Sequence, residues 1–106
     1  MIEITLEVCS LASGSSGNSI YIASKDQQVL VDAGLSGKQI TEKLAQIDVS
    51  GDELDAILVT HEHQDHLKGV GILSRRFNLP IYATEKTWGV AEESLGKIKS
   101  QHRCLL

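Results

Sequence analysis

The spacing of apolar residues changes along this chain, and the change restricts the folds that the chain can adopt. From residue 2 to residue 8, apolar residues recur at every second position, which predicts a strand with one buried face. An apolar run at residues 20–23 and a second stretch at 29–32, apolar until it ends on the carboxylate of Asp32, are separated by a polar turn at 25–27 and predict two more strands. The first third of the chain is therefore expected to fold as a β-meander.

Beyond the meander, apolar stripes of helical period alternate with short apolar runs. Ile40, Leu44 and Ile47 form one stripe of a short helix, and Ser36 with a glutamine three residues later resembles a capping box at its start. The run ending at residue 60 is too short for a helix and is expected to be a central strand covered on both faces. Strands followed by alternating helices and strands predict an α/β layered domain. The expected elements after the meander are a helix from Ser36, a single turn near 50–53, a strand within 54–60, a helix over 67–77 that ends before Pro80, a strand at 81–83, a helix over 84–91 and a strand at 103–106.

Composition narrows the class of protein. The 106 residues suit one domain, and no apolar stretch approaches the roughly 18–20 residues of a membrane span. The net charge of −4 has the wrong sign for a domain that binds nucleic acid by charge alone. The N-terminus lacks a signal-peptide pattern, so we expect a cytoplasmic protein in which Cys9 and Cys104 are reduced thiols.

Three of the four histidines lie within residues 60–66, Thr-His-Glu-His-Gln-Asp-His, directly after the expected buried strand. In an extended segment, side chains two positions apart point to the same side, so His61 and His63 project together toward one ion. Asp65 and His66 come round at adjacent positions where the chain turns into the next helix, and they can bind a second ion. Nitrogen and oxygen donors of this kind suit zinc, manganese or iron. A solvated polar loop, the alternative, requires no such spacing, so the segment predicts a metal site.

These residues carry a resemblance to a known family. Residues 30–34, Leu-Val-Asp-Ala-Gly, followed by His-Glu-His-Gln-Asp-His at 61–66, resemble the first two motifs of the metallo-β-lactamase fold. The Gly/Ser loop at 11–19, with Lys-Thr-Trp at 86–88, resembles more narrowly the bacterial YycJ (WalJ) group of metal-dependent hydrolases, thought to be DNA exonucleases. The resemblance extends over nearly the whole chain. It implies the N-terminal half of an αββα sandwich, with residues 1–106 as a single, incomplete domain.

The resemblance also implies a cofactor and residue roles. His61 and His63 correspond to ligands of a first divalent metal ion, and Asp65 and His66 to ligands of a second. Asp32 corresponds to an aspartate that supports the ligand loop by hydrogen bonds, although it also fits a residue that ends a strand. Members of the family use two ions, zinc first with manganese or iron as alternatives, to activate water against a phosphodiester, ester or amide. Asp65 is the residue expected to orient that nucleophile.

The chain ends before the later metal ligands of the family, and this leaves three hypotheses. The first is the N-terminal part of a metal-dependent hydrolase, a phosphodiesterase or DNA exonuclease in preference to an enzyme for small esters or lactones. The second is a half-domain that forms a homodimer through its uncovered sheet face. The third is a non-catalytic metal-binding module. His102 and Cys104, two positions apart, are the only plausible further donors, and they match no motif of the family.

Two weaker features concern a nucleic-acid substrate. Ser16 and Asn18 lie in the Gly/Ser loop, which either contacts a substrate phosphate or simply connects two strands tightly. Trp88 and Phe77 can stack on bases or, as we expect, pack in the core. Several basic residues form either a local basic patch or a solvated surface. They are Arg75, Arg76, Lys97, Lys99 and Arg103.

Overall fold

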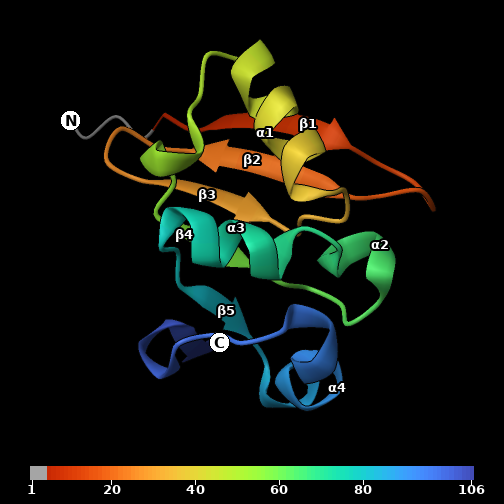
Figure 1. The fold of residues 1–106 in the computed structure, drawn as a ribbon. Helices are drawn as coiled ribbons and strands as arrows, with labels where there is room; N and C mark the ends of the chain where they lie inside the picture. Colours follow the sequence, from red (N-terminus) through yellow and green to blue (C-terminus); the bar gives the residue numbers. More distant parts are fainter. Residues whose placement is uncertain (1–4) are drawn as a thin grey trace.

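The computed structural model describes residues 5–106, which form one mixed β-sheet with helices on one of its faces (Figure 1). The six strands lie in the sheet in their order along the chain. They are β1 (Glu7–Ala12), β2 (Ser19–Ala23), β3 (Gln28–Val31), β4 (Ala56–Leu58), β5 (Ile81–Ala83) and β6 (Arg103–Leu105). The helices are α1 (Gly37–Gln46), α2 (Gln64–Leu67), α3 (Val70–Phe77) and α4 (Glu85–Leu95), with single 3₁₀ turns η1 (Gly51–Glu53) and η2 (Ser100–His102).

Strand direction changes after β3. The pairs β1–β2 and β2–β3 are antiparallel, whereas β3–β4, β4–β5 and β5–β6 are parallel and are joined through helices. This is the predicted meander followed by alternating helices and strands. The strand predicted at residues 2–8 begins instead at Glu7 among the described residues, and residues 2–4 of that prediction lie outside them.

The helix predicted from Ser36 forms with the predicted cap. The Ser36 hydroxyl accepts the backbone N–H of Gln39, and the Gln39 side chain accepts the backbone N–H of Ser36, both at 3.2 Å. The side chains of Ile40 and Leu44 are fully buried beneath the helix, as their spacing predicts. No helix among residues 5–106 combines the length and the apolar character that crossing a membrane requires.

The helix predicted over 67–77 forms only from Val70 onward, as α3, because Leu67 belongs to the separate short helix α2 and the two are separated at Gly69. The Asp65 carbonyl, which would accept the Gly69 N–H in a continuous helix, instead accepts the backbone N–H of Asn18. Gly69 donates its own N–H to the Ala33 carbonyl at 2.7 Å. Contacts with the ends of other segments thus replace helical hydrogen bonds at this position.

Helices α1, α3 and α4 bury the core against one face of the sheet. Tyr21, Leu30, Ile57 and Ile81 form a row across four paired strands, and each is at most 5% exposed. Trp88 of α4 is 6% exposed and donates its indole N–H to a backbone carbonyl of β6 at 2.8 Å. Trp88 is therefore a core residue, as expected, and is not available for stacking on bases.

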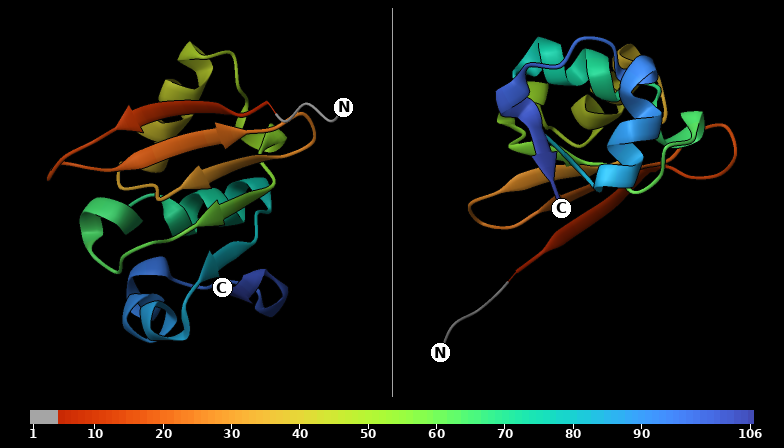
Figure 2. Two further views of the ribbon diagram at one scale, coloured as in Figure 1. Left: turned by 180° about the vertical axis from the view of Figure 1, so that it is seen from behind. Right: turned by 90° about the horizontal axis from the view of Figure 1, so that it is seen from below.

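The opposite face of the sheet is bare among the described residues, as the right-hand view of Figure 2 shows. Strand alternation and register place apolar side chains across it, and we call this surface the open face. Val8 on it is 67% exposed and Ile20 is 38% exposed. The prediction that the strand within 54–60 is covered on both faces is wrong for residues 5–106, because the helices cover only one side of β4. The apolar residues of the open face are Val8, Ile20, Ile22, Val29, Val31, Ala56, Leu58, Tyr82 and Cys104.

Parallel pairing of β3 and β4 brings their carboxyl ends to the same edge of the sheet. Asp32 directly follows β3, and Thr60 follows β4 by two residues. The short helix α2 lies beyond this edge in Figure 1. The edge therefore gathers the residues of the predicted metal site.

Candidate metal centre

Asp32 is a buried residue whose carboxylate connects the segments that meet at this edge of the sheet. It has a left-handed backbone, with φ at 64°, and is 4% exposed. Its Oδ1 accepts the backbone N–H of Thr60 at 2.8 Å, and its Oδ2 accepts the Thr60 hydroxyl at 2.5 Å. The same Oδ2 lies 2.7 Å from Nδ1 of His66. One carboxylate thus ties the ends of β3 and β4 to residues 61–66, which we call the ligand segment.

The hydrogen bond with Asp32 decides which ring nitrogen of His66 is free. With Nδ1–H donating to the carboxylate, Nε2 keeps its lone pair for a metal ion. That Nε2 lies 3.6 Å from Oδ2 of Asp65. The ring centroid of His61 lies 4.7 Å from that of His66, and ligand atoms of Asp32, His61 and His66 all lie within 4.8 Å of one another. These groups converge on one point at the sheet edge.

His63 lies at the outer side of this cluster. Its ring centroid is 6.4 Å from that of His61, and the residue is exposed. It occupies the N-cap position of α2 without a side-chain cap hydrogen bond. The predicted pair of His61 and His63 is therefore farther apart than the pair of His61 and His66.

The donor set fits a divalent metal ion. Imidazole nitrogens with a carboxylate oxygen are the ligands that zinc, manganese and iron accept. The oxygens of Asp32 already accept three hydrogen bonds, which suits support of His66 better than direct binding of an ion. Gln64 is turned toward α4 instead, where its Nε2 donates to the Ser94 hydroxyl at 3.0 Å.

Asn18 braces the ligand segment, a contact that the sequence did not predict. Its backbone N–H donates to the Asp65 carbonyl at 2.7 Å, and its side-chain Nδ2 lies 3.1 Å from both that carbonyl and Oδ2 of Asp65. Its amide also bonds to both backbone groups of Gly14. The Asn18 side chain thus joins its own loop to Asp65, whereas Ser16 in the same loop is exposed.

Gly34 permits this close packing. Its N–H donates to the Asn18 carbonyl at 2.9 Å, and a Cβ built on it would lie only 1.8 Å from the carbonyl oxygen of Asp65. Three segments meet here through their backbone atoms: the Gly/Ser loop, the residues that follow β3 and the ligand segment. They leave no room for a side chain at Gly34. The glycine two positions after Asp32 is the sequence feature from which this contact could have been inferred.

His102 and Cys104 lie apart from the cluster, because β5 separates β6 from β4 in the sheet. His102 ends η2, and Cys104 lies within β6. In the part of the chain that the structure describes, the group of side chains able to hold one ion includes neither residue. Cys9 and Cys104 are both free thiols.

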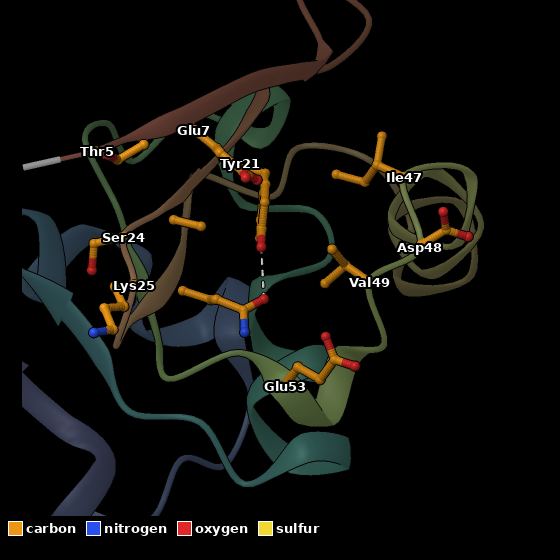
Figure 3. A pocket seen from close by; sticks show the side chains of 11 residues that line it. Thr5, Glu7, Tyr21, Ser24, Lys25, Ile47, Asp48, Val49 and Glu53 are labelled. Atoms are coloured by element: carbon orange, nitrogen blue, oxygen red, sulfur yellow. Dashed lines mark hydrogen bonds between the residues drawn. The ribbon is translucent and has the colours of Figure 1, made fainter.

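A hollow of about 520 Å³ lies at the opposite edge of the sheet, near the start of β3 (Figure 3). The Tyr21 hydroxyl donates to Oε1 of Gln28 at 2.6 Å within it. Burial, and then the carboxylates of Glu7 and Glu53, raise the pKa of Tyr21 above its ordinary value of 10.0, so this hydroxyl stays protonated at neutral pH. The residues lining the hollow include none of the candidate ligands, so it is separate from the metal centre.

Asparagine at position 32 is expected to lower zinc affinity by about 10–100-fold while the chain stays folded. The amide tolerates a left-handed backbone but cannot accept hydrogen bonds from all three donors that now surround Asp32. One of these three donors would be left without an acceptor, which should lower the free energy of unfolding by about 1–3 kcal/mol. Calorimetric zinc titration and urea unfolding measure the two effects. Unchanged zinc affinity in the variant would contradict a role for Asp32 in orienting His66.

Comparison with known proteins assigns this chain to a family. Residues 12–103 match the metallo-beta-lactamase superfamily. The chain is 52% identical over 105 residues to exodeoxyribonuclease WalJ of Streptococcus pneumoniae serotype 2 (strain D39), covering 97% of this chain and 39% of that protein. It is 46% identical to exodeoxyribonuclease YycJ of Bacillus anthracis, covering 88% of this chain and 35% of that protein. Among solved structures, the Rm3 metallo-beta-lactamase matches with a TM-score of 0.66 and 28% identity, over 76% of this chain and 30% of that one.

The chain thus spans about two fifths of the length of the curated relatives that it matches. Its mixed sheet with helices matches the fold of the solved structures over that part. The family implies divalent metal ions, and the described residues include a possible metal-binding group around His61 and His66, with Asp32 beside them. Because the family match covers residues 12–103, from the end of β1 to the start of β6 and with the whole ligand segment, this chain belongs to the metallo-beta-lactamase superfamily.

Proposed function

We propose that this chain forms the metal-binding half of a hydrolase that cleaves phosphodiester bonds at the ends of DNA strands. The observation that carries the proposal is the ligand segment with His66 fixed by Asp32, in a chain 52% identical to a protein named an exodeoxyribonuclease. Since the chain spans 39% of that relative, the activity is proposed for a protein of the relative's full length, here called the full-length protein.

Each member of the ligand segment has a role in this proposal. His61 and His63 bind a first divalent ion, and Asp65 and His66 bind a second. Zinc is the first choice for both sites, with manganese or iron as alternatives. Ions bound there would lower the pKa of a bound water to about 7 and would neutralise charge that develops on the phosphodiester. Asp32 keeps Nε2 of His66 turned toward the site.

The Gly/Ser loop serves the same reaction in two ways. Asn18 acts through Asp65, because its amide nitrogen already lies 3.1 Å from Oδ2 of that carboxylate. Asp65, held in this way, orients the attacking water by accepting its hydrogen bond. Ser16 is exposed, and in the proposal its hydroxyl and the neighbouring backbone N–H groups contact the substrate phosphate.

The test is a nuclease assay of the full-length protein on end-labelled single-stranded and duplex DNA. We expect single nucleotides to be released from strand ends with zinc or manganese present, activity to vanish on chelation, and activity to return when metal is restored. Substrate affinity should fall steeply as salt rises. If the protein hydrolyses an aryl ester or a lactone but releases no nucleotides, its substrate is a small molecule and not DNA. If the protein takes up metal but hydrolyses none of these substrates, it is a non-catalytic metal-binding module.

The open face belongs to the same proposal. Exposed Val8 and Ile20 lie on it beside half-buried apolar side chains, a pattern typical of a surface that packs against another layer. We propose that the second sheet of the αββα architecture covers this face in the full-length protein. A second copy of the chain can cover the same face when residues 1–106 are alone in solution.

The 106-residue chain on its own is therefore expected to self-associate at micromolar concentration in sedimentation velocity experiments. Ile20→Lys should shift the chain toward monomer, because association would bury the added charge. Val90→Lys is the matched control, since Val90 is 60% exposed on α4, in the helical layer. A wild-type chain that remains monomeric would contradict the expectation.

We also propose that the protein acts in the cytoplasm. Cys9 and Cys104 are both free thiols, a state typical of reducing compartments. Fractionation of cells that produce the full-length protein, with detection by antibody, tests this location.

A further inference from the structure

Four basic side chains surround one hollow of about 540 Å³ on the helical side of the sheet, between α3, α4 and β6. We call it the basic hollow. In a chain with a net charge of −4, it is a local concentration of positive charge. A smaller hollow beside it shares two of these side chains and adds His102. The charged side chains lining the basic hollow are Arg75, Lys97, Lys99 and Arg103, with Glu92 as the single acidic one.

The two arginines are held in place by their neighbours. Arg75 donates from Nη1 to two carbonyls at the end of α4 and just beyond it, at 2.6 and 3.2 Å. Arg103 lies over the ring of Trp88, with Cζ 4.6 Å from the ring centroid, and its Nη2 lies 3.1 Å from Oε1 of Glu92. A guanidinium has five N–H donors, so each arginine keeps donors for a further anion after these contacts.

The two lysines add exposed charges on an anchored segment. Lys97 and Lys99 lie in the connection between α4 and η2, and both are exposed. Ile98 between them is half-buried and packs against the core, which holds this connection to the protein. Within residues 5–106, the ion pairs do not include either lysine. Their charges therefore remain available to a ligand.

The basic hollow is connected to the ligand segment through α4. Gln64, between His63 and Asp65, donates to Ser94 at 3.0 Å, and Lys97 follows Ser94 by three residues. An enzyme that cuts at a strand end must hold the rest of the strand elsewhere on its surface. Because Trp88 is buried, the hollow offers charges for phosphates and no aromatic platform for bases.

We propose that the basic hollow binds the phosphate backbone of the nucleic-acid strand whose end lies at the ligand segment. This inference rests on the proposed function and extends it, because it assigns the part of the substrate beyond the scissile bond to Arg75, Lys97, Lys99 and Arg103. Binding there is independent of base sequence and depends strongly on salt, as phosphate contacts require.

The experiment measures binding of a fluorescent single-stranded oligonucleotide to the full-length protein by anisotropy, over a salt series with chelator present. The double variant Lys97→Gln/Lys99→Gln should bind roughly tenfold more weakly near physiological salt. The slope of log affinity against log salt concentration should become shallower by about 1.4. Each phosphate contact on a single strand contributes about 0.7 to this slope, and the variant loses two contacts. The matched control is Lys25→Gln/Lys43→Gln, which removes the same charge from exposed positions outside the hollow.

The control pair should keep nearly the parent affinity and slope. Equal losses in both pairs, no loss in either, or no binding by the unmodified protein would overturn the proposal. Nucleotide release with metal restored is scored separately on the same proteins. Nuclease activity with unchanged binding in Lys97→Gln/Lys99→Gln would overturn this inference alone. A retained binding difference without nuclease activity would overturn the proposed function alone.

Discussion

The substitution Gly34→Ala is expected to have two effects at once: it destabilises the fold and displaces Asp65 from the candidate metal centre. The added methyl group would lie 1.8 Å from the Asp65 carbonyl oxygen and 2.7 Å from the backbone nitrogen of Asn18. These two atoms are themselves joined by a 2.7 Å hydrogen bond, so the ligand segment can yield only by losing it. Overpacking of this kind costs about 1–3 kcal/mol and more where backbone must shift. Urea unfolding and zinc titration measure the two effects.

Gly89→Ala is the matched control for this substitution. A Cβ at Gly89 meets nothing within 4 Å, and the residue lies in the middle of α4. The same chemical change should therefore stabilise the chain by about 0.5–1 kcal/mol, because alanine favours a helix over glycine. The packing argument fails if Gly34→Ala unfolds at the same urea concentration as the unmodified chain and keeps its zinc affinity.

His63→Ala is expected to abolish metal-dependent hydrolysis by the full-length protein without unfolding it. His63 is exposed and caps α2 without a side-chain hydrogen bond, so alanine there removes no structural contact of that kind. As a proposed ligand, its loss should lower activity by more than the roughly 10–100-fold that loss of a ligand's outer partner costs. Initial rates of nucleotide release and metal content per chain are the measurements.

Gln64→Ala separates a ligand role from a general effect on the segment. Gln64 is the next residue, equally exposed, and its side chain bonds to Ser94 at 3.0 Å, away from the cluster. Surface substitutions of this kind change stability by no more than about 0.5 kcal/mol, so rates and metal content should stay near those of the unmodified protein. Normal metal content and rate in His63→Ala would remove His63 from the proposed ligand set. Equal losses in both variants would point to the segment's conformation instead.

Elements defined by local pattern could be predicted from the sequence. The apolar run at residues 20–23 and the cap at Ser36 are patterns of neighbouring residues, and the strand and the cap that they predict both form. The helix expected over 67–77 starts at Val70 instead, because its break depends on the hydrogen bond of Gly69 to Ala33, far away in sequence. Within residues 5–106 only one face of β4 is covered, because apolar residues on both sides of a strand do not show which layer packs on each side.

The candidate site shows the same division. Its histidines and Asp65 lie within one hexapeptide, so their chemistry is visible in sequence, and their assignment to two ions stays a prediction. The contact of Asn18 with Asp65 joins residues 47 positions apart and requires the close backbone approach at Gly34. The gathering of Arg75 with Lys97, Lys99 and Arg103 likewise depends on how α3 packs against α4.

The order of strands in the sheet has a consequence for how the chain is made. Every strand from β2 to β6 pairs with the strand that immediately precedes it in sequence. During synthesis, at about 5–20 residues per second, each new strand therefore emerges when its neighbour already exists, and no position in the sheet has to be held open for a later segment. The bond of His66 with Asp32 becomes available as soon as α2 leaves the ribosome. The edge that carries the candidate metal ligands can thus assemble on the nascent chain, ahead of β5 and β6.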